Sequence, residues 1–144
     1  MSGRYRMGEV SEVLFVCVHN AGRSQMAAAL FNRAASERGL VVRAESAGTA
    51  PADRVHPNVV ESMRELSFDI SGARPALLTD EMVTRAGRVV TMGCAVDGDA
   101  CPAILLKDVD DWGLPDPKGA PPDEVRAIRA TIGERVGRLL DELG

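Results

Sequence analysis

One short stretch, Val13 to Ser24, limits most strongly what this chain can fold into. It reads V-L-F-V-C-V-H-N-A-G-R-S, so an apolar, β-branched run ends near Cys17 and a helix-forming segment follows Ser24. A continuous apolar run of this kind is typical of a strand that is buried on both faces of a parallel sheet. The stretch therefore predicts a strand, a loop and a helix in direct succession.

Within this stretch, Cys17, Arg23 and Ser24 follow the pattern C-x5-R-S. The backbone N–H groups of such a loop can turn inward to form a nest for a tetrahedral oxyanion, and the helix N-terminus adds partial positive charge. The planar guanidinium of Arg23 matches two oxygens of the anion. The same field favours a thiolate over a thiol. We therefore predict that Cys17 is a nucleophile aimed at the anion bound in its own loop.

The whole loop contributes to this predicted oxyanion site. Asn20 and Gly22 supply the unusual backbone conformations that such a loop needs. Ser24 can cap the helix and donate a hydrogen bond to the Cys17 thiolate. His19 either takes part in catalysis or bonds a backbone carbonyl. The predicted oxyanion-binding residues are Val18, His19, Asn20, Ala21, Gly22, Arg23 and Ser24. The alternative is a buried cysteine at a strand end, before an ordinary capped helix.

Length and charge limit the class of protein. The 144 residues are most simply one domain, residues 1–144, in which 1–9 form a loose N-terminal extension. The formal net charge of −4 gives no global field that would attract nucleic acid or an anionic membrane, so we expect neither as a partner. No run approaches a membrane span, and residues 1–10 lack the apolar stretch of a signal peptide. We therefore expect a cytoplasmic protein.

Strand and helix patterns alternate along the chain. We expect strands at 13–18, 40–45 and 88–92, with a candidate fourth at 103–106. Helices are expected from about 24 to 39, from 56–57, after 79 and after 121–122. This alternation predicts a three-layer α/β/α domain with a four-stranded parallel sheet, whose ligands bind at the carboxyl ends of the strands. Cys17, Ser46 and Gly93 fall at such ends.

Two further cysteines follow the third expected strand. Cys94 and Cys101 lie in C-A-V-D-G-D-A-C, a polar segment with six residues between the two thiols. A flexible loop would let them approach each other and a third thiol, so we interpret them as a resolving pair. Two unrelated buried thiols remain an alternative. The other alternative is a metal site formed by the cysteines together with His19 and His56. These residues lack the paired spacing of structural zinc sites, so we predict no metal.

Asp116 is the candidate general acid. It lies in W-G-L-P-D-P, where prolines on both sides would hold the carboxyl group in a rigid turn. An acidic turn residue without a chemical role is the alternative. We expect Asp110 and Asp111 to be solvated, Trp112 to anchor this loop to the core, and His56 to begin a helix.

Five motifs carry a resemblance to a known family. They are C-V-H-N-A-G-R-S-Q-M-A from Cys17, S-A-G-T from Ser46, D-I-S-G from Asp69, T-M-G-C from Thr91 and W-G-L-P-D-P from Trp112. In this order they resemble the arsenate reductases built on the low-molecular-weight tyrosine phosphatase fold. The resemblance implies that fold over nearly the whole chain.

The resemblance also implies a role for each motif residue. In that family the first cysteine attacks arsenate, the arginine and loop amides bind its oxygens, and the D-P aspartate assists departure of an oxygen. These roles fall on Cys17, Arg23 and Asp116. In the thioredoxin-coupled branch a second cysteine releases arsenite and a third presents the resulting disulfide to thioredoxin, and these roles fall on Cys94 and Cys101.

We therefore predict an arsenate reductase that needs an external thiol reductant and no other cofactor. Reduction of As(V) to As(III) takes two electrons, which a dithiol supplies on becoming a disulfide, whereas a phosphatase needs only the first thiol. A phosphate-shaped nest should also bind phosphate and sulfate.

Three alternatives remain open. The C-V-H-N-A-G-R-S loop also resembles that of actinobacterial relatives that join arsenate to mycothiol, for which a mycoredoxin would be the partner. A tyrosine phosphatase is the second alternative, although the phosphatases of the family tend to carry tyrosines beside the D-P motif and Tyr5 is the only tyrosine in this chain. An oxyanion-binding or thiol-sensing module without turnover is the third. Thioredoxin-coupled members often bind potassium through a Glu on the first helix, but Ala28 stands there, so we do not predict that site.

Overall fold

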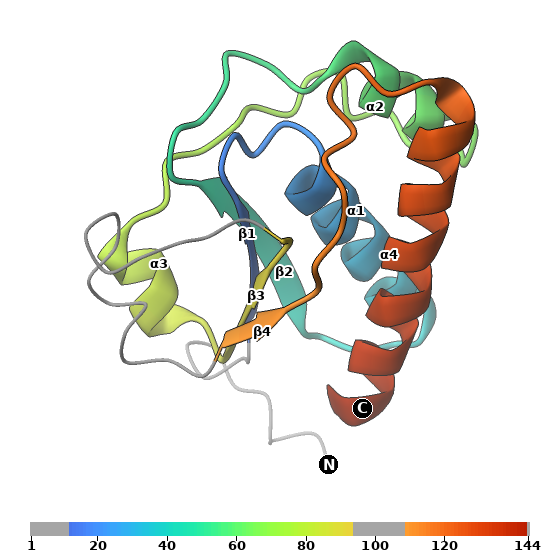
Figure 1. Ribbon diagram of the computed structural model, residues 1–144. Helices are drawn as coiled ribbons and strands as arrows, with labels where there is room; N and C mark the ends of the chain where they lie inside the picture. Colours follow the sequence, from blue (N-terminus) through green and yellow to red (C-terminus); the bar gives the residue numbers. More distant parts are fainter. Residues whose placement is uncertain (1–11, 94–108, 144) are drawn as a thin grey trace.

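The computed structural model describes residues 12–93 and 109–143. Four parallel strands form one sheet in the order β2-β1-β3-β4 (Figure 1). The strands are β1 (Glu12–Cys17), β2 (Arg43–Gly48), β3 (Arg88–Thr91) and β4 (Val109–Asp111). The helices are α1 (Arg23–Glu37), α2 (Pro57–Arg64), α3 (Asp80–Arg85) and α4 (Pro122–Leu143). The predicted α/β fold with a four-stranded parallel sheet is confirmed.

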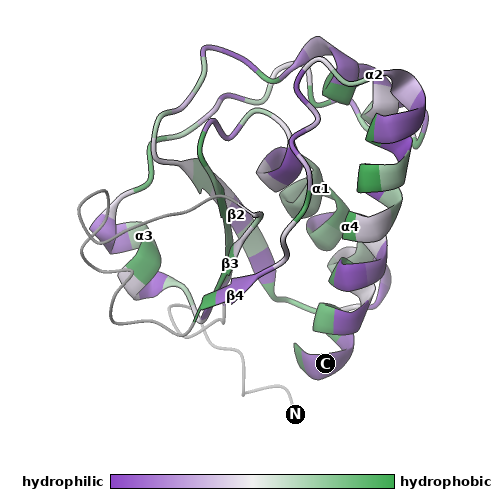
Figure 2. Cartoon of the chain, in the orientation of Figure 1, coloured by the Kyte–Doolittle hydropathy of each residue, from purple (hydrophilic) through white to green (hydrophobic). Residues whose placement is uncertain are grey.

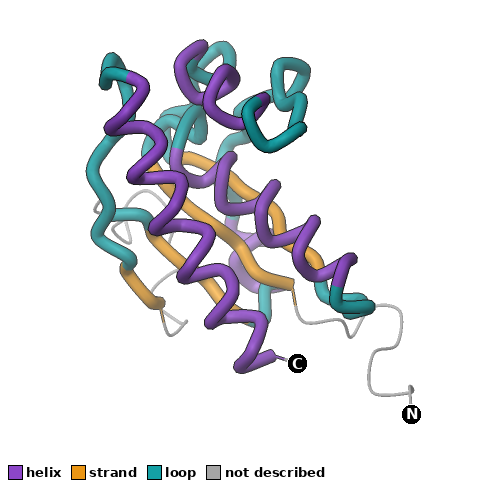
Figure 3. Tube along the Cα trace, turned by 90° about the vertical axis from the view of Figure 1, so that its right-hand side faces the viewer, coloured by secondary structure: helices purple, strands orange, loops and turns teal. Residues whose placement is uncertain are grey.

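Helices cover both faces of the sheet. α1 and α4 cross one face side by side, whereas α3 lies on the other (Figures 1 and 3). Successive side chains of β1 alternate between the two layers: Phe15 packs in the core under α1 and α4, and Leu14 and Val16 pack in the core with α3. Figure 2 shows apolar residues along the central strand, whereas β4 and part of β2 are hydrophilic. The central strand is therefore buried on both faces, as its apolar run predicts.

Local sequence explains where the helices begin and end. Thr79 caps α3, because its side chain accepts the N–H of Met82 at 3.2 Å. α4 begins at Pro122, a favourable residue for the first turn, and acidic residues follow it. The chain leaves α1 through Gly39, whose φ of +72° is easily adopted without a Cβ. These boundaries agree with the predicted ones.

The second strand begins later than predicted. We expected it at 40–45, but the N–H of Leu40 still bonds the carbonyl of Ala35, so that segment completes the end of α1. β2 instead runs to Gly48, and Ser46 and Gly48 pair with Phe15 and Cys17 of β1. Ser46 therefore lies within β2, and the carboxyl end of the strand is Gly48 and not the expected position near Ser46. The candidate strand at 103–106 lies outside the described residues, and the fourth strand of the sheet is β4.

Phe15 connects the sheet to the segment that follows β4. Its ring makes an edge contact with Phe31 of α1 at 6.0 Å between centroids, and a tilted contact with Trp112 at 5.4 Å. Phe15 and Phe31 are fully buried, and Trp112 is half-buried. Trp112 therefore anchors the segment after β4 to the core, as predicted.

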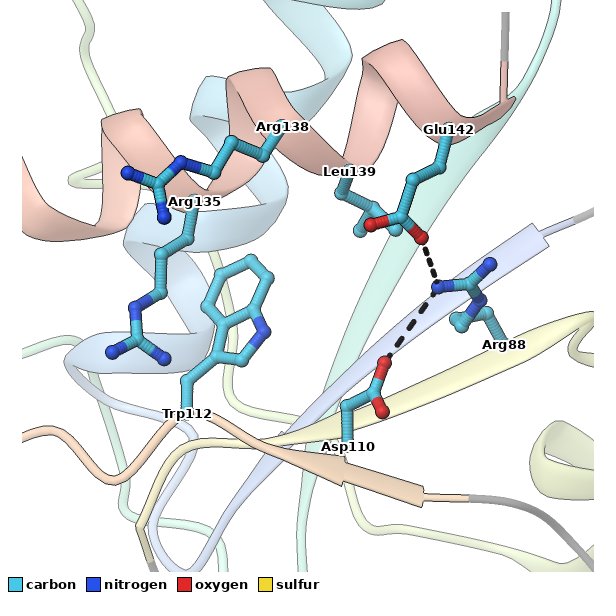
Figure 4. Close-up of a pocket in the computed structure, with 7 residues that line it drawn as sticks. All are labelled: Arg88, Asp110, Trp112, Arg135, Arg138, Leu139 and Glu142. Carbon is cyan, nitrogen blue, oxygen red and sulfur yellow. Dashed lines mark hydrogen bonds and ion pairs between the residues drawn. The ribbon is translucent and has the colours of Figure 1, made fainter.

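A hollow of about 190 Å³ opens between β4 and the second half of α4 (Figure 4). Arg88 lies at its edge and bonds Glu142 of α4 at 2.9 Å and Asp110 of β4 at 3.6 Å. Arg88 pairs with Val13 in the sheet, four positions before Cys17. The ion pairs therefore join strands and helix toward the amino ends of the strands, at the opposite end from Cys17.

No helix within residues 12–93 and 109–143 combines the length and the apolar character that crossing a bilayer requires.

Charged side chains also join α2 to α4. Glu65, which follows α2, bonds Arg126 at 2.8 Å and Arg129 at 2.9 Å. Hydrogen bonds from Arg126 and then Arg129 lower the pKa of Glu65 from 4.5 to about 2. A carboxyl group with a lowered pKa stabilises the fold at pH values above its unfolded pKa, and this contribution disappears as the pH falls through the folded pKa.

We expect Glu65→Gln to lower the free energy of unfolding at pH 7, because two guanidinium groups lose their shared partner. The difference from the wild type should shrink as the pH falls from 4.5 to about 2, where the wild-type carboxyl group also becomes neutral. Urea unfolding at several pH values measures this difference. Glu37→Gln is the control, because Glu37 has no ion-pair partner among the described residues. A difference that does not change with pH would contradict the assignment.

Candidate active site

Cys17 ends the central strand and has only 3% of its surface exposed. Its Sγ accepts the backbone N–H of Asn20 at 3.2 Å and lies 2.9 Å from the Ser24 hydroxyl oxygen. Asn20 has φ of +49°, the left-handed conformation that its sequence position predicts. The chain therefore turns back on itself directly after the strand, and two hydrogen-bonding groups converge on the sulfur.

The Asn20 side chain determines which way the Ser24 hydroxyl donates. The N–H of Ala76 faces Asn20 Oδ1 at 2.9 Å, and because an N–H can only donate, this atom is the oxygen of the amide. The amide nitrogen then donates to Ser24 Oγ at 2.7 Å. Ser24 Oγ is thus an acceptor toward Asn20, and its own hydrogen is free to donate to Cys17. This arrangement stabilises a thiolate.

Ser24 does not cap α1, contrary to our prediction. The residue at the cap position is Gly22, and no side chain caps this helix. Ser24 is the second residue of α1, where its hydroxyl is bonded to Asn20 and Cys17. The predicted contact with the thiol is present without the cap.

The carbonyl groups of the loop are held outward by the chain after β2. The N–H groups of Ala50, Ala52 and His56 bond the carbonyls of Val18, His19 and Ala21 at 2.8, 3.0 and 2.9 Å. A trans peptide places its N–H opposite its carbonyl. The next N–H group after each of these carbonyls therefore points inward: those of His19, Asn20 and Gly22. The N–H of Asn20 confirms this, since it donates to Cys17 Sγ.

The inward amides leave donors for an anion. Of these inward groups, the N–H of Gly22 donates to no protein atom in the part of the chain that the structure describes, and neither do the neighbouring N–H groups of Ala21 and Arg23. Inward N–H groups beside a helix N-terminus form an anion-binding nest. This loop can therefore hold a tetrahedral oxyanion next to Cys17.

Arg23 is held in place by two carbonyl groups. Its Nη1 donates to Met92 after β3 at 2.8 Å and to Leu114 after β4 at 2.7 Å. Nε and Nη2 make no hydrogen bond with residues 12–93 or 109–143, and the side chain is 9% exposed. One edge of the guanidinium is thus fixed, and the remaining donors are left for oxygens of a bound anion.

Asp111 organises the segments that hold Arg23, a role that the sequence analysis missed. Its Oδ1 accepts the Thr91 hydroxyl at 2.9 Å, the N–H of Gly93 at 2.7 Å and the N–H of Gly113 at 3.4 Å. Burial alone would raise the pKa of Asp111, but these hydrogen bonds and the nearby Arg23 lower it. Asp111 is exposed, as predicted, but its Oδ1 is bound by these three donors, which the prediction missed. The signal in the sequence was an Asp two residues before a Gly, which is typical of an Asx-turn.

The loop that carries Asp116 packs against the oxyanion loop. A Cβ on Gly22 would lie 2.8 Å from Pro117 Cγ and 3.5 Å from the His56 ring, so a glycine is needed at this contact. Asp116 itself is exposed, and its Oδ1 accepts the N–H of Lys118 at 3.0 Å. Burial lowers the pKa of His56, while the charge of Asp116 opposes this effect. Asp116, His56 and Gly22 therefore meet at the edge of the site.

The chain as a whole is similar to known proteins. Residues 12–144 match the family described as low molecular weight phosphotyrosine protein phosphatase. This chain belongs to that family. A protein of Halobacterium salinarum named "Putative arsenate reductase" is 44% identical over 131 residues, which cover 89% of each chain.

Solved structures give the same result for the fold. A structure described as an arsenate reductase in the phosphate binding state superposes with a TM-score of 0.80 at 29% identity, covering 94% of this chain and 100% of that one. The thioredoxin-dependent arsenate reductase of Corynebacterium glutamicum gives a TM-score of 0.71 at 40% identity, covering 92% of this chain and 60% of that one. The family predicted from the motifs is confirmed.

The remaining candidates are Cys94, Cys101 and His19. Cys94 and Cys101, the predicted resolving pair, lie outside the described residues. His19 is exposed, and its Nδ1 bonds the carbonyl of Ala50 at 3.2 Å. A carbonyl only accepts, so Nδ1 carries the proton in this contact. His19 thus makes the backbone contact that was one of its two predicted roles.

We expect Ser24→Ala to slow alkylation of Cys17 by iodoacetamide at pH 7 by about tenfold or more, because the thiolate loses a hydrogen bond from a hydroxyl group. Mass spectrometry of the peptide that contains Cys17 measures the rate at this thiol alone. Ser36→Ala, on an exposed position of the same helix, is the control and should react like the wild type. Equal rates for the two variants would show that Ser24 does not activate the thiol.

Proposed function

We propose that this protein is an arsenate reductase that uses Cys17 as nucleophile and two further cysteines as a relay to thioredoxin. The observation that carries the proposal is the nest around Cys17, in which inward amides, the Ser24 hydroxyl and the free donors of Arg23 surround a thiol. The relatives support the choice of reaction, since the Corynebacterium glutamicum protein is a thioredoxin-dependent arsenate reductase.

In the first step the Cys17 thiolate attacks the arsenic of hydrogen arsenate. An S–As bond forms, one As–O bond breaks, and the departing hydroxide takes a proton from Asp116 and leaves as water. Arsenic remains As(V) in the Cys17 adduct. The inward amides and Arg23 bind the three remaining oxygens, whose charge the attack concentrates. Asp116 suits the role because its turn packs against Gly22, at the edge of the nest.

In the second step the Cys94 thiolate attacks the Cys17 sulfur. An S–S bond forms, and the electrons of the broken S–As bond go to arsenic, which leaves as arsenite, As(III). Cys101 then attacks Cys94, which frees the Cys17 thiolate and leaves a Cys94–Cys101 disulfide. Thioredoxin reduces that disulfide by supplying two electrons and two protons. Because the cycle begins with three free thiols, we place it in the reducing cytoplasm.

The relay can be tested in a single turnover without external reductant. We expect the fully reduced protein to form about one arsenite per chain and to lose about 2 Da, with a bond between Cys94 and Cys101. Cys94→Ser should bind arsenate but release no arsenite, because it lacks the thiol that attacks the Cys17 adduct in the proposed relay. Mass spectrometry of the free thiols and an arsenite assay measure both results.

Other outcomes would overturn the proposal in distinguishable ways. Arsenite production by Cys94→Ser with thioredoxin as sole reductant would exclude the relay. If all thiols stayed free and arsenite appeared only after mycothiol was added, the protein would be an arsenate–mycothiol transferase. Substantial hydrolysis of an aryl phosphate ester without arsenite formation would identify a phosphatase.

Phosphate should inhibit arsenate reduction competitively, and sulfate more weakly. The nest recognises a tetrahedral oxyanion through amides and Arg23, which make the same contacts with either anion, so selectivity must arise in the chemical step. Initial rates at several arsenate and phosphate concentrations measure this. If inhibition by phosphate did not weaken as arsenate increased, the two anions would not share the site.

A further inference from the structure

The first turn of α2 lies behind both loops of the site. The backbone N–H of His56 bonds the carbonyl of Ala21 at 2.9 Å, which holds the oxyanion loop. Two residues later, Asn58 reaches the other loop, which carries Asp116. Pro57 stands between them as the first residue of α2 and fixes the backbone there. One short segment therefore contacts the loop of the nucleophile and the loop of the general acid.

Asn58 closes the turn that carries Asp116. Its Nδ2 donates to the carbonyl of Pro117 at 2.8 Å and to the carbonyl of Ala120 at 3.1 Å. Both partners are carbonyls, which only accept, so the amide nitrogen must face them. Both hydrogens of the amide are thus used on this one turn. Asn58 is half-buried, which strengthens these bonds relative to bonds in open water.

The rest of the turn is held by its own atoms. The N–H of Lys118 bonds Asp116 Oδ1, and the N–H of Ala120 bonds the carbonyl of Pro117 at 2.9 Å. Among the hydrogen bonds of the described residues, those from Asn58 are the ones that join residues 115–120 to another element. The position of the turn relative to the nest therefore depends on Asn58, on the contact of Pro117 with Gly22 and, just before the turn, on the bond from Arg23 to the Leu114 carbonyl.

We propose that Asn58 is a positioning residue, which holds the turn of Asp116 against the oxyanion loop at the distance that proton transfer requires. The inference rests on the proposed function, in which Asp116 protonates the departing oxygen. An exposed turn without this tether can move away from the nest while the nest itself stays intact. A displacement of about 1 Å can slow a reaction by about 100-fold.

Asn58→Asp tests the inference, because it keeps the shape of the side chain and replaces the donor by an acceptor that faces two carbonyls. We expect the single-turnover rate of arsenite formation to fall by about 10- to 100-fold. The KM for arsenate should stay within about twofold, since the amides and Arg23 bind the anion. Asn58→Ala removes the donor without adding charge, and should give the same result if Asn58→Asp fails to fold.

A double-mutant cycle separates positioning from a general loss of structure. If Asn58 acts through Asp116, then Asn58→Asp should cause no further loss of rate in an Asp116→Asn background. Glu61→Gln is the matched control: Glu61 lies one turn farther along α2, is exposed, and bonds only Arg64 in the described structure. It should react at the wild-type rate.

Hydrogen exchange tests the tether without any reaction. The amides of Lys118 and Ala120 should exchange faster in Asn58→Asp than in the wild type or in Glu61→Gln. Equal exchange would overturn the inference, as would equal loss of rate in both backgrounds of the cycle. If these amides exchange faster in Asn58→Asp but the wild-type protein forms no arsenite, the role of Asn58 in holding the turn is supported and the proposed function is rejected.

Discussion

The outward bonds of three loop carbonyls are the constraint on which the candidate site depends. A peptide cannot direct its carbonyl and its N–H to the same side. Because the chain after β2 takes the carbonyls of Val18, His19 and Ala21, the amides of the loop face Cys17. Gly48 makes this possible, since a Cβ there would collide with the carbonyl oxygen of Val18. The end of β2 is thus pressed against the loop that it shapes.

The second half of the chain supplies what the first loop cannot. Arg23 is fixed by carbonyls from the segments that follow β3 and β4, and Asp111 ties those segments together. The parallel sheet explains this cooperation, because all of its strands end at one edge. A loop of seven residues therefore receives the carbonyls that fix its Arg23, its rigidity and its candidate general acid from parts of the chain that are about 30 to 100 residues away.

The sequence predicted those features that depend on local chemistry. The apolar run before Cys17, the left-handed Asn20 and the anchoring of Trp112 follow from residue type and spacing, and the structure has all three. The start of β2 was missed because the end of α1 extends through Leu40 by backbone hydrogen bonds, which leave no side-chain signal.

Long-range contacts were beyond the reach of sequence patterns. Asp111 and Asn58 bond segments that only the fold brings near them, and an acidic or amide residue type does not by itself identify such a distant partner. Ser24 was predicted to be the N-cap of α1 because Ser favours that position, but α1 begins at Arg23 and Gly22 occupies the cap position. The roles of Cys94, Cys101 and Asp116 remain predictions, since they concern chemistry rather than position.

The tilted contact of Trp112 with Phe15 gives the molecule an intrinsic fluorescent reporter. The chain has one tryptophan, so its tryptophan emission comes from this single place. The indole stands two residues before the carbonyl that holds Arg23 and four before Asp116. Its backbone N–H also bonds Thr91 at the end of β3 at 2.8 Å. Entry of an anion, which must engage Arg23, can therefore be followed by the fluorescence of the unlabelled protein.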